Sequence, residues 1–124
     1  MEKEKAGELL DIYGKAWVEQ DPDLIISIFT ADATCDDPRE PLNYGHEGIR
    51  NYWVNKVVNQ QKDISFKILN FWATEDAVIA EWEAKFTDTV RNLKIDMREV
   101  AIFTVSGDKF SSLREYYKTS KVPV

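Results

Sequence analysis

The chain has 124 residues, 44% of them hydrophobic and 31% charged, which is typical of one folded domain rather than of a disordered or membrane-spanning chain. Its formal net charge of -6 argues against binding to nucleic acids or anionic membranes, which require a basic surface. Cys35 is the only cysteine and His46 the only histidine, so we expect a cytoplasmic protein without disulfides, a metal site or a cofactor.

Helical spacing of apolar side chains predicts that the chain begins with two helices. Over residues 4–20 the apolar positions lie on one stripe, which includes Tyr13, so this helix should bury that stripe. Asp21 followed by Pro22 is typical of an N-cap and a first helical position. We therefore expect a second, short helix that starts there and ends near Thr30.

A brief strand and a third helix are predicted next. Residues 33–37 have a strand-like pattern that Pro38 ends, and the following residues have the composition of a loop that closes at Gly45. From about residue 46 to residue 60 the apolar side chains again return with helical spacing. The first half of the chain is thus predicted to hold three helices and one short strand.

The second half of the chain changes to an alternating pattern, which predicts long strands. The expected strands are residues 64–68, 78–86, about 93–105 and 110–117, with turns at 74–76 and 106–109. Helices followed by consecutive strands imply an α+β fold in which the helices cover one face of a curved antiparallel sheet. Residues 1–124 are predicted to form a single domain.

The residues between Tyr13 and Trp53 occur in a distinctive order. They read Tyr13-Gly-Lys-Ala-Trp17, Asp21-Pro22, Ile28-Phe29-Thr30-Ala31-Asp32-Ala33-Thr34, Asp36-Asp37-Pro38 and Gly45-His46-Glu47-Gly48-Ile49-Arg50-Asn51-Tyr52-Trp53. This order resembles the nuclear-transport-factor-2-like superfamily, which includes ketosteroid isomerases, SnoaL-like polyketide cyclases, scytalone dehydratase and limonene epoxide hydrolase. The resemblance, which extends to Lys118, implies a cystatin-like cone: a curved antiparallel sheet packed against three N-terminal helices, with a pocket inside and a homodimer interface on the outer face of the sheet.

Within the superfamily, the first third of the chain is most similar to the ketosteroid isomerases. Tyr13 matches a tyrosine that donates a hydrogen bond to an enolate oxygen, and Asp37 matches an aspartate that moves a proton between two carbons. The third element of that family, an aspartic acid in the third long strand, falls here on Ala101. Glu99 projects to the same face, where it could carry a raised pKa and donate a proton, or could pair with Arg114 or Arg50.

Each of these residues also has a structural interpretation. Tyr13 can be a core aromatic residue, Asp37 can cap the turn before a proline, and Glu99 can form an ion pair. Cys35 has the same strand parity as Asp37 but is typical of a small buried hydrophobic residue. His46, at the start of a helix, is not expected to act as a base.

Two other activities of the superfamily fit the sequence less well. Scytalone dehydratase chemistry uses pocket histidines, and this chain has only His46. Limonene epoxide hydrolase chemistry uses an Asp-Arg-Asp arrangement, but Asp96 and Arg98 have the strand parity that points away from the predicted cavity. A polyketide cyclase, by contrast, would need little more than an acid in an apolar pocket.

The sequence therefore predicts an apolar small-molecule pocket with acid-base residues in it. Its catalytic residues are predicted to be Asp37, Tyr13 and Glu99, and its lining Trp17, Phe29, Tyr44, Trp53, Trp82, Met97, Ala101 and Leu113. The predicted function is that of a cofactor-free isomerase or cyclase acting on a hydrophobic carbonyl compound. The alternatives are a non-catalytic ligand-binding module and a domain that acts only through its dimer surface.

Overall fold

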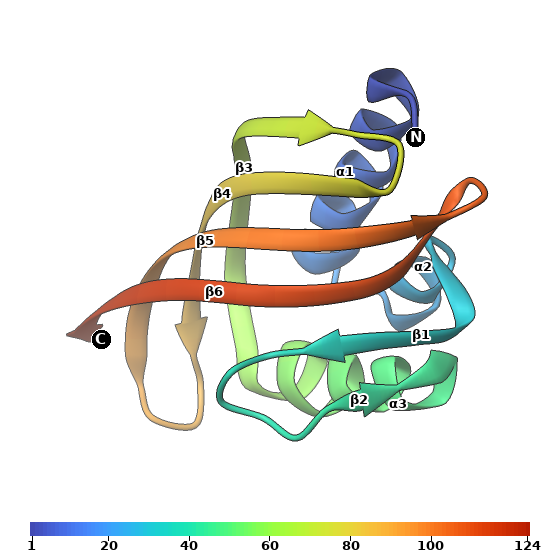
Figure 1. Ribbon diagram of the computed structural model, residues 1–124. Coiled ribbons are helices and arrows are strands. Elements are labelled where there is room, and N and C mark those ends of the chain that lie inside the picture. Colours follow the sequence, from blue (N-terminus) through green and yellow to red (C-terminus); the bar gives the residue numbers. More distant parts are fainter.

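Six strands form one sheet, and the helices pack against one of its faces (Figure 1). The computed structural model describes all 124 residues. The helical elements are α1 (Lys3–Val18), α2 (Pro22–Ile26), α3 (Gly45–Tyr52) and a π-helical segment, η1 (Trp53–Val58). The strands are β1 (Phe29–Asp36), β2 (Asn43–Tyr44), β3 (Gln61–Ala73), β4 (Ala77–Asp88), β5 (Leu93–Ser106) and β6 (Lys109–Pro123). None of the helices is long and apolar enough to span a membrane.

The strand order is β2-β1-β6-β5-β4-β3, which confirms the predicted α+β fold class. Four of the neighbouring pairs are antiparallel, whereas β1 runs parallel to β6. The sheet is therefore mixed at this one pairing. The parallel contact joins distant parts of the chain: the Phe110 backbone N–H donates to the Ile28 carbonyl oxygen over 2.9 Å. This pairing places the cavity-facing residues of β1 directly beside those of β6.

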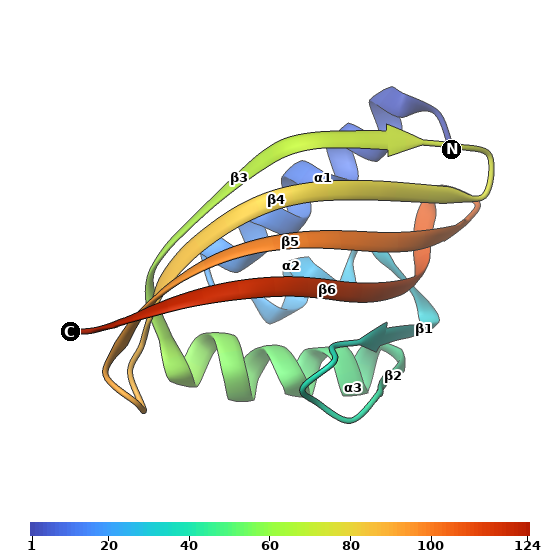
Figure 2. The same ribbon diagram turned by 60° about the vertical axis from the view of Figure 1, so that its left-hand side comes forward.

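The long strands bend strongly around the helices, as Figure 2 shows for β3 to β6. Register shifts between Lys62 and Ser65 and between Ile68 and Asn70 break the regular pairing of β3 with β4. Such bulges increase local twist and bend a strand. The helices lie on the concave side of this bend.

The helix boundaries show what local sequence determines and what packing changes. Helix α2 begins as predicted, because the Asp21 carboxylate accepts hydrogen bonds from the backbone N–H groups of Asp23 and Leu24. It ends at Ile26, earlier than predicted, and β1 starts at Phe29 instead of residue 33. The third helix covers the predicted residues, but from Trp53 it continues with π-helical hydrogen bonding. Segments of this type frequently occur at functional sites.

The core lies between α1 and the sheet and is rich in aromatic rings. Trp82 and Phe103 are completely buried, and the ring of Tyr13 packs on Trp82 with 4.9 Å between ring centroids. Close approach of α1 depends on Gly14, since a Cβ atom there would lie 2.4 Å from the Phe66 ring. The stripe predicted on the first helix is thus buried against the sheet.

Candidate acid-base site

A cavity of about 60 Å³ lies between the helices and the concave face of the sheet. Aromatic side chains form much of its wall, namely Tyr13, Trp17, Phe29, Tyr52, Trp53 and Tyr117. Three carboxyl groups also border it, those of Asp37, Glu99 and Glu115. No lysine, arginine or histidine side chain lines this cavity. It is therefore an apolar space into which only acidic ionisable groups and phenols project.

Asp37 follows the last residue of β1 and is held by three hydrogen bonds. Its Oδ1 accepts from the Tyr117 hydroxyl over 2.7 Å and from the Arg39 backbone N–H over 2.9 Å. Its Oδ2 accepts from the Tyr52 hydroxyl over 3.1 Å. The side chain is only 8% exposed. A carboxylate has about four lone-pair positions, so one acceptor position remains for a ligand.

Glu99 and Glu115 form a second acidic group on the concave face. Glu99 of β5 is opposite Tyr117, while Ala101 is opposite Glu115 of β6, so the two glutamates are diagonal neighbours on one face. Their carboxyl groups are within hydrogen-bonding reach of each other. Glu99 is 1% exposed, and its Oε2 atom has no hydrogen-bond partner. The pair thus has unused hydrogen-bonding capacity.

The two glutamates hold a proton more tightly than ordinary carboxyl groups. Burial and the nearby Glu115 raise the pKa of Glu99 well above its usual value. Burial raises the pKa of Glu115 to about 7, although its hydrogen bond with Glu99 acts in the opposite direction. The carboxylate of Asp37 raises both pKa values further. The raised pKa of Glu99 therefore favours its protonated form near neutral pH.

Tyr13 is positioned by α1 over the same part of the cavity. Burial raises the pKa of its hydroxyl, and the carboxyl groups of Glu115 and Glu99 raise it further. The phenol therefore keeps its proton and can donate a hydrogen bond to a ligand. Tyr13, Asp37 and Glu99, which the sequence analysis selected as catalytic candidates, all border one cavity.

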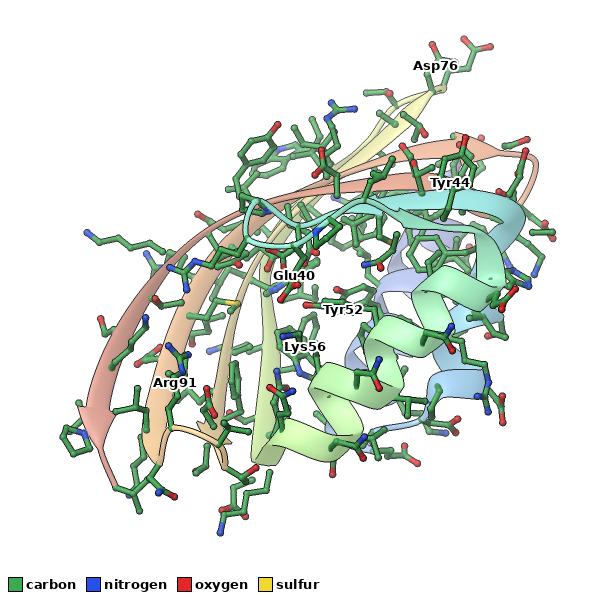
Figure 3. All side chains as sticks on the ribbon, turned by 90° about the horizontal axis from the view of Figure 1, so that it is seen from below. Glu40, Tyr44, Tyr52, Lys56, Asp76 and Arg91 are labelled. Atoms are coloured by element: carbon green, nitrogen blue, oxygen red, sulfur yellow. The ribbon has the colours of Figure 1, made fainter.

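Five of the predicted lining residues border this cavity and three do not. Trp17, Phe29, Trp53, Met97 and Leu113 line it. Trp82 and Ala101 point to the concave face as predicted but lie completely buried in the core, because α1 packs over that part of the sheet. Tyr44 lies on the short edge strand β2, 69% exposed and away from Tyr52 and Lys56 (Figure 3).

Among the ionisable residues of the cavity, the sequence analysis missed three: Tyr52, Glu115 and Tyr117. For the last two a signal existed, since Leu113, Glu115 and Tyr117 alternate along β6 and share a face. The ion pairs considered for Glu99 do not form. Arg50 instead pairs with Asp23 at 3.0 Å, and Arg114 is exposed on the other face of β6.

The two residues whose roles were left open have different positions. His46 lies outside the cavity, and its Nε2 atom is 2.8 Å from the Phe29 carbonyl oxygen, so the ring ties α3 to β1. Cys35 borders the cavity as a buried free thiol, and burial raises its pKa. The nearby Glu115 raises this pKa further, so the thiol keeps its proton and forms part of the cavity wall. No group of three or more His, Cys, Asp or Glu side chains is arranged to hold a metal ion.

The cavity adjoins an outer cleft of about 300 Å³. Both spaces are bordered by Asp37, Tyr52, Gln61, Met97 and Tyr117. The rim of the cleft is charged: Lys56 pairs with Glu40 at 3.1 Å, and Arg91 pairs with Asp88 at 2.8 Å. Figure 3 shows Tyr52, Lys56 and Glu40 on one side of this opening and Arg91 on the other. A ligand longer than the inner cavity could extend into this cleft.

Solved structures with the same fold come from proteins of several kinds. A hexachlorocyclohexane dehydrochlorinase, LinA type 2, has a TM-score of 0.83 at 15% identity, with 97% of this chain and 88% of that chain covered. A Catenulispora acidiphila protein with a ketosteroid isomerase-like fold, solved with trimethylamine, has a TM-score of 0.81 at 18% identity, covering 90% and 85% of the chains. The epoxide hydrolase/cyclase-like enzyme SalBIII, described in pyran ring formation, has a TM-score of 0.80 at 22% identity, covering 94% and 93%.

These similarities establish the fold, because all three identities are low. Among curated protein sequences none matches the chain. A family model described as the SnoaL-like domain matches residues 10–113, which is most of the chain. The suspected resemblance is thereby confirmed, and the protein belongs to the SnoaL-like domain family.

Proposed function

We propose that the protein is a cofactor-free acid-base enzyme, an isomerase or cyclase, that acts on a hydrophobic carbonyl compound. The observation that carries the proposal is that an acceptor, Asp37, and two donors, Tyr13 and protonated Glu99, border one small apolar cavity. Acceptor and donors of this kind are what enolate chemistry requires, since one carbon loses a proton while the carbonyl oxygen gains charge.

The proposed reaction assigns one step to each residue. Asp37 takes a proton from the carbon next to the carbonyl group, and the electron pair of that C–H bond moves to form an enolate. Tyr13 and Glu99 donate hydrogen bonds to the enolate oxygen. In an isomerase, protonated Asp37 then returns the proton to another carbon. In a cyclase, the enolate carbon attacks a second carbonyl carbon of the same molecule, the electron pair of that C=O bond moves to its oxygen, and this oxygen takes the proton from Asp37. Water is excluded by the aromatic wall, which strengthens these interactions.

The size of the cavity limits which part of a substrate reacts there. A water molecule occupies about 30 Å³ in the liquid, and the inner cavity measures about 60 Å³. It accommodates a carbonyl group and its neighbouring carbon, while the rest of the substrate would lie in the outer cleft. A substrate with a bulky rigid ring system would require the side chains of Tyr52 or Met97 to move.

Hydrogen-deuterium exchange into small ketones such as cyclopentanone tests the proposed proton transfer without knowledge of the natural substrate. In deuterium oxide, the wild-type protein should accelerate exchange at the carbon next to the carbonyl group, as measured by NMR. Asp37→Asn should lower the rate about 100-fold or more. Asp36→Asn is the matched control, because Asp36 is exposed next to it on β1. Equal rates for wild type and Asp37→Asn would refute the role of Asp37.

A non-catalytic ligand-binding module is the second candidate. The hydrogen bonds of Asp37 favour it, since a carboxylate held by Tyr52, Tyr117 and a backbone N–H can serve structure alone. The similar Catenulispora acidiphila protein was solved with a small molecule, trimethylamine. A binding module should keep its ligand affinity in Asp37→Asn and should not accelerate exchange. For either function, the free, buried Cys35 is compatible with the cytoplasmic location expected from the sequence.

A further inference from the structure

The inner cavity is rich in carboxyl groups and is lined by no basic side chain. Three carboxyl groups border it, and no basic side chain among the lining residues balances them. Neither Glu99 nor Glu115 forms a salt bridge with any lysine or arginine of the chain. An uncompensated cluster of buried carboxyl groups is costly unless it takes up protons or a cation.

Four of the N–H and O–H donors that line the cavity already have hydrogen-bond partners. The Trp17 indole N–H donates to Gln61 Oε1 over 2.8 Å, and the Trp53 indole N–H donates to the Ala16 carbonyl oxygen over 3.4 Å. The hydroxyls of Tyr52 and Tyr117 both donate to Asp37. These side chains therefore offer the cavity their aromatic rings rather than their donors.

One acceptor in the cavity has no partner at all. Glu99 is 1% exposed, lines the cavity, and leaves its Oε2 atom without a hydrogen bond. A buried carboxyl oxygen is rarely left unsatisfied unless a ligand or water completes it. This observation is independent of the charge count. When Glu99 is ionised, its free oxygen accepts a hydrogen bond, so a donor would complete it.

We propose that the inner cavity binds the protonated head of a small aliphatic amine. An alkylammonium group supplies both what the carboxyl groups lack, a positive charge, and what Glu99 Oε2 lacks, an N–H donor. Aromatic rings around a desolvated cation add cation-π attraction. The cavity of about 60 Å³ holds a head of two or three non-hydrogen atoms. A short alkyl chain would pass Met97 and Tyr117 towards the outer cleft.

The bound ammonium would replace the proton that the glutamate pair shares. The titratable groups near the pair are Tyr13 on α1, Cys35, Asp36 and Asp37 from β1 and its end, Tyr52 on α3 and Tyr117 on β6. None of them carries a positive charge. Since Glu115 titrates with a pKa of about 7, amine binding should strengthen as the pH rises through that range and should release protons. Four cations, Arg39, Lys56, Arg91 and Lys121, line the outer cleft but not the inner cavity. Lys56 and Arg91 are paired with acids.

This proposal gives a ligand class to the binding alternative described above and does not depend on turnover. Isothermal titration calorimetry with n-butylamine at pH about 8 tests it, with butan-1-ol as the uncharged probe of similar shape. Butylammonium should bind wild type at least about tenfold more tightly than butanol. Glu99→Gln and Glu115→Gln should each weaken butylammonium about tenfold or more. Glu81→Gln, a charge change outside this cavity, should leave it unchanged.

The outcomes separate this proposal from the proposed enzyme function. Equal affinity for butanol, unchanged amine affinity in both cavity variants, or no amine binding by wild type would each overturn it. Amine binding without ketone exchange would leave it standing and count against the enzyme. Ketone exchange without amine binding would overturn this proposal and support the enzyme function. Titrations in buffers of different ionisation enthalpy would measure the released protons, and proton release that is absent in Glu115→Gln supports displacement of the shared proton.

Discussion

At the scale of single residues, the acidity of the cavity should be visible in the stability of the whole protein. A carboxyl group whose pKa is higher in the folded than in the unfolded state lowers the free energy of unfolding as the pH rises between the two values. For Glu115 this window extends from its ordinary pKa of 4.5 to about 7. Glu115→Gln should therefore be more stable than wild type at pH about 8, by on the order of 2 kcal/mol, and lose this advantage at pH about 4.5.

Urea denaturation at several pH values would measure this difference. Glu83→Gln on the outer side of β4 is a control of equal charge change, since Glu83 faces Arg98 instead of the cavity. A constant difference between wild type and Glu115→Gln at every pH would contradict the raised pKa.

The two tyrosines that hold Asp37 should contribute unequally to stability. Tyr117→Phe removes the 2.7 Å hydrogen bond to Oδ1 and Tyr52→Phe the 3.1 Å bond to Oδ2. Each loss should cost about 1.5–3 kcal/mol because the acceptor is charged, with the larger cost for Tyr117→Phe. Tyr116→Phe, next to it and on the exposed face of β6, should be neutral in the same urea denaturation experiment. A neutral Tyr117→Phe would mean that Asp37 is held mainly by the Arg39 backbone.

The sequence predicts which side chains border the cavity where a motif or the alternation along one strand determines their position. Tyr13 and Asp37 were selected by motif order, and Glu99 by parity with Ala101; all three predicted catalytic residues border the cavity. Glu115 was missed because its importance depends on its position beside Glu99. The register of β5 against β6, which brings the two together, was not predicted. Whether any of these residues is catalytic stays a prediction.

At the scale of secondary structure elements, α1 is fitted to the sheet by a single glycine. A Cβ atom at Gly14 would lie 2.4 Å from Phe66 Cδ1, so Gly14→Ala should destabilise the protein by about 1–3 kcal/mol despite the higher helix propensity of alanine. Gly7 in the same helix has its nearest contact at an ordinary 3.4 Å, and Gly7→Ala should be neutral or stabilising. Thermal unfolding of the two variants measures the contrast. Equal melting temperatures would mean that Phe66 moves aside freely.

Element positions were predicted well wherever the period of the pattern was regular. The four long strands and α1 overlap the residues predicted for them, although β3 and β6 extend well beyond those residues. The end of α2 and the start of β1 differ from the prediction because Ile28 and Phe29, which have helical spacing, lie beside β6 instead. The Phe110 N–H of β6 donates a hydrogen bond to the Ile28 carbonyl oxygen. The π-helical geometry of η1 was not predicted from the sequence; its buried Trp53 and Val57 line the cavity.

At the scale of the whole molecule, the outer face of the sheet is proposed as a homodimer interface. In Figure 1 the helices α1 and α2 lie behind the sheet, and no element covers the face toward the viewer. Apolar side chains gather there from neighbouring strands, namely Trp72, Ile79, Val100, Ile102 and Tyr116. Trp72 and Tyr116 are 52% and 56% exposed in the single chain. Exposed apolar clusters of this kind mark association surfaces.

Light scattering coupled to size-exclusion chromatography should therefore give twice the chain mass of 14.4 kDa. Val100→Glu should yield monomers, because the symmetric dimer would bury two like charges. Val90→Glu, at the exposed turn between β4 and β5, adds the same charge away from this face and should leave the dimer intact. A wild-type protein of single-chain mass would refute the dimer.

The meeting point of the inner cavity and the outer cleft has a consequence for kinetics. Tyr52 and Tyr117 border both spaces, and their hydroxyls donate hydrogen bonds to Asp37. A ligand that moves from one space to the other therefore disturbs hydrogen bonds that are formed in the ligand-free protein. Entry and release are slowed together by such a constriction, while their ratio, the affinity, is unaffected. A ligand of modest affinity can thus have a long residence time in this protein, and stopped-flow measurement would detect it where equilibrium titration would not.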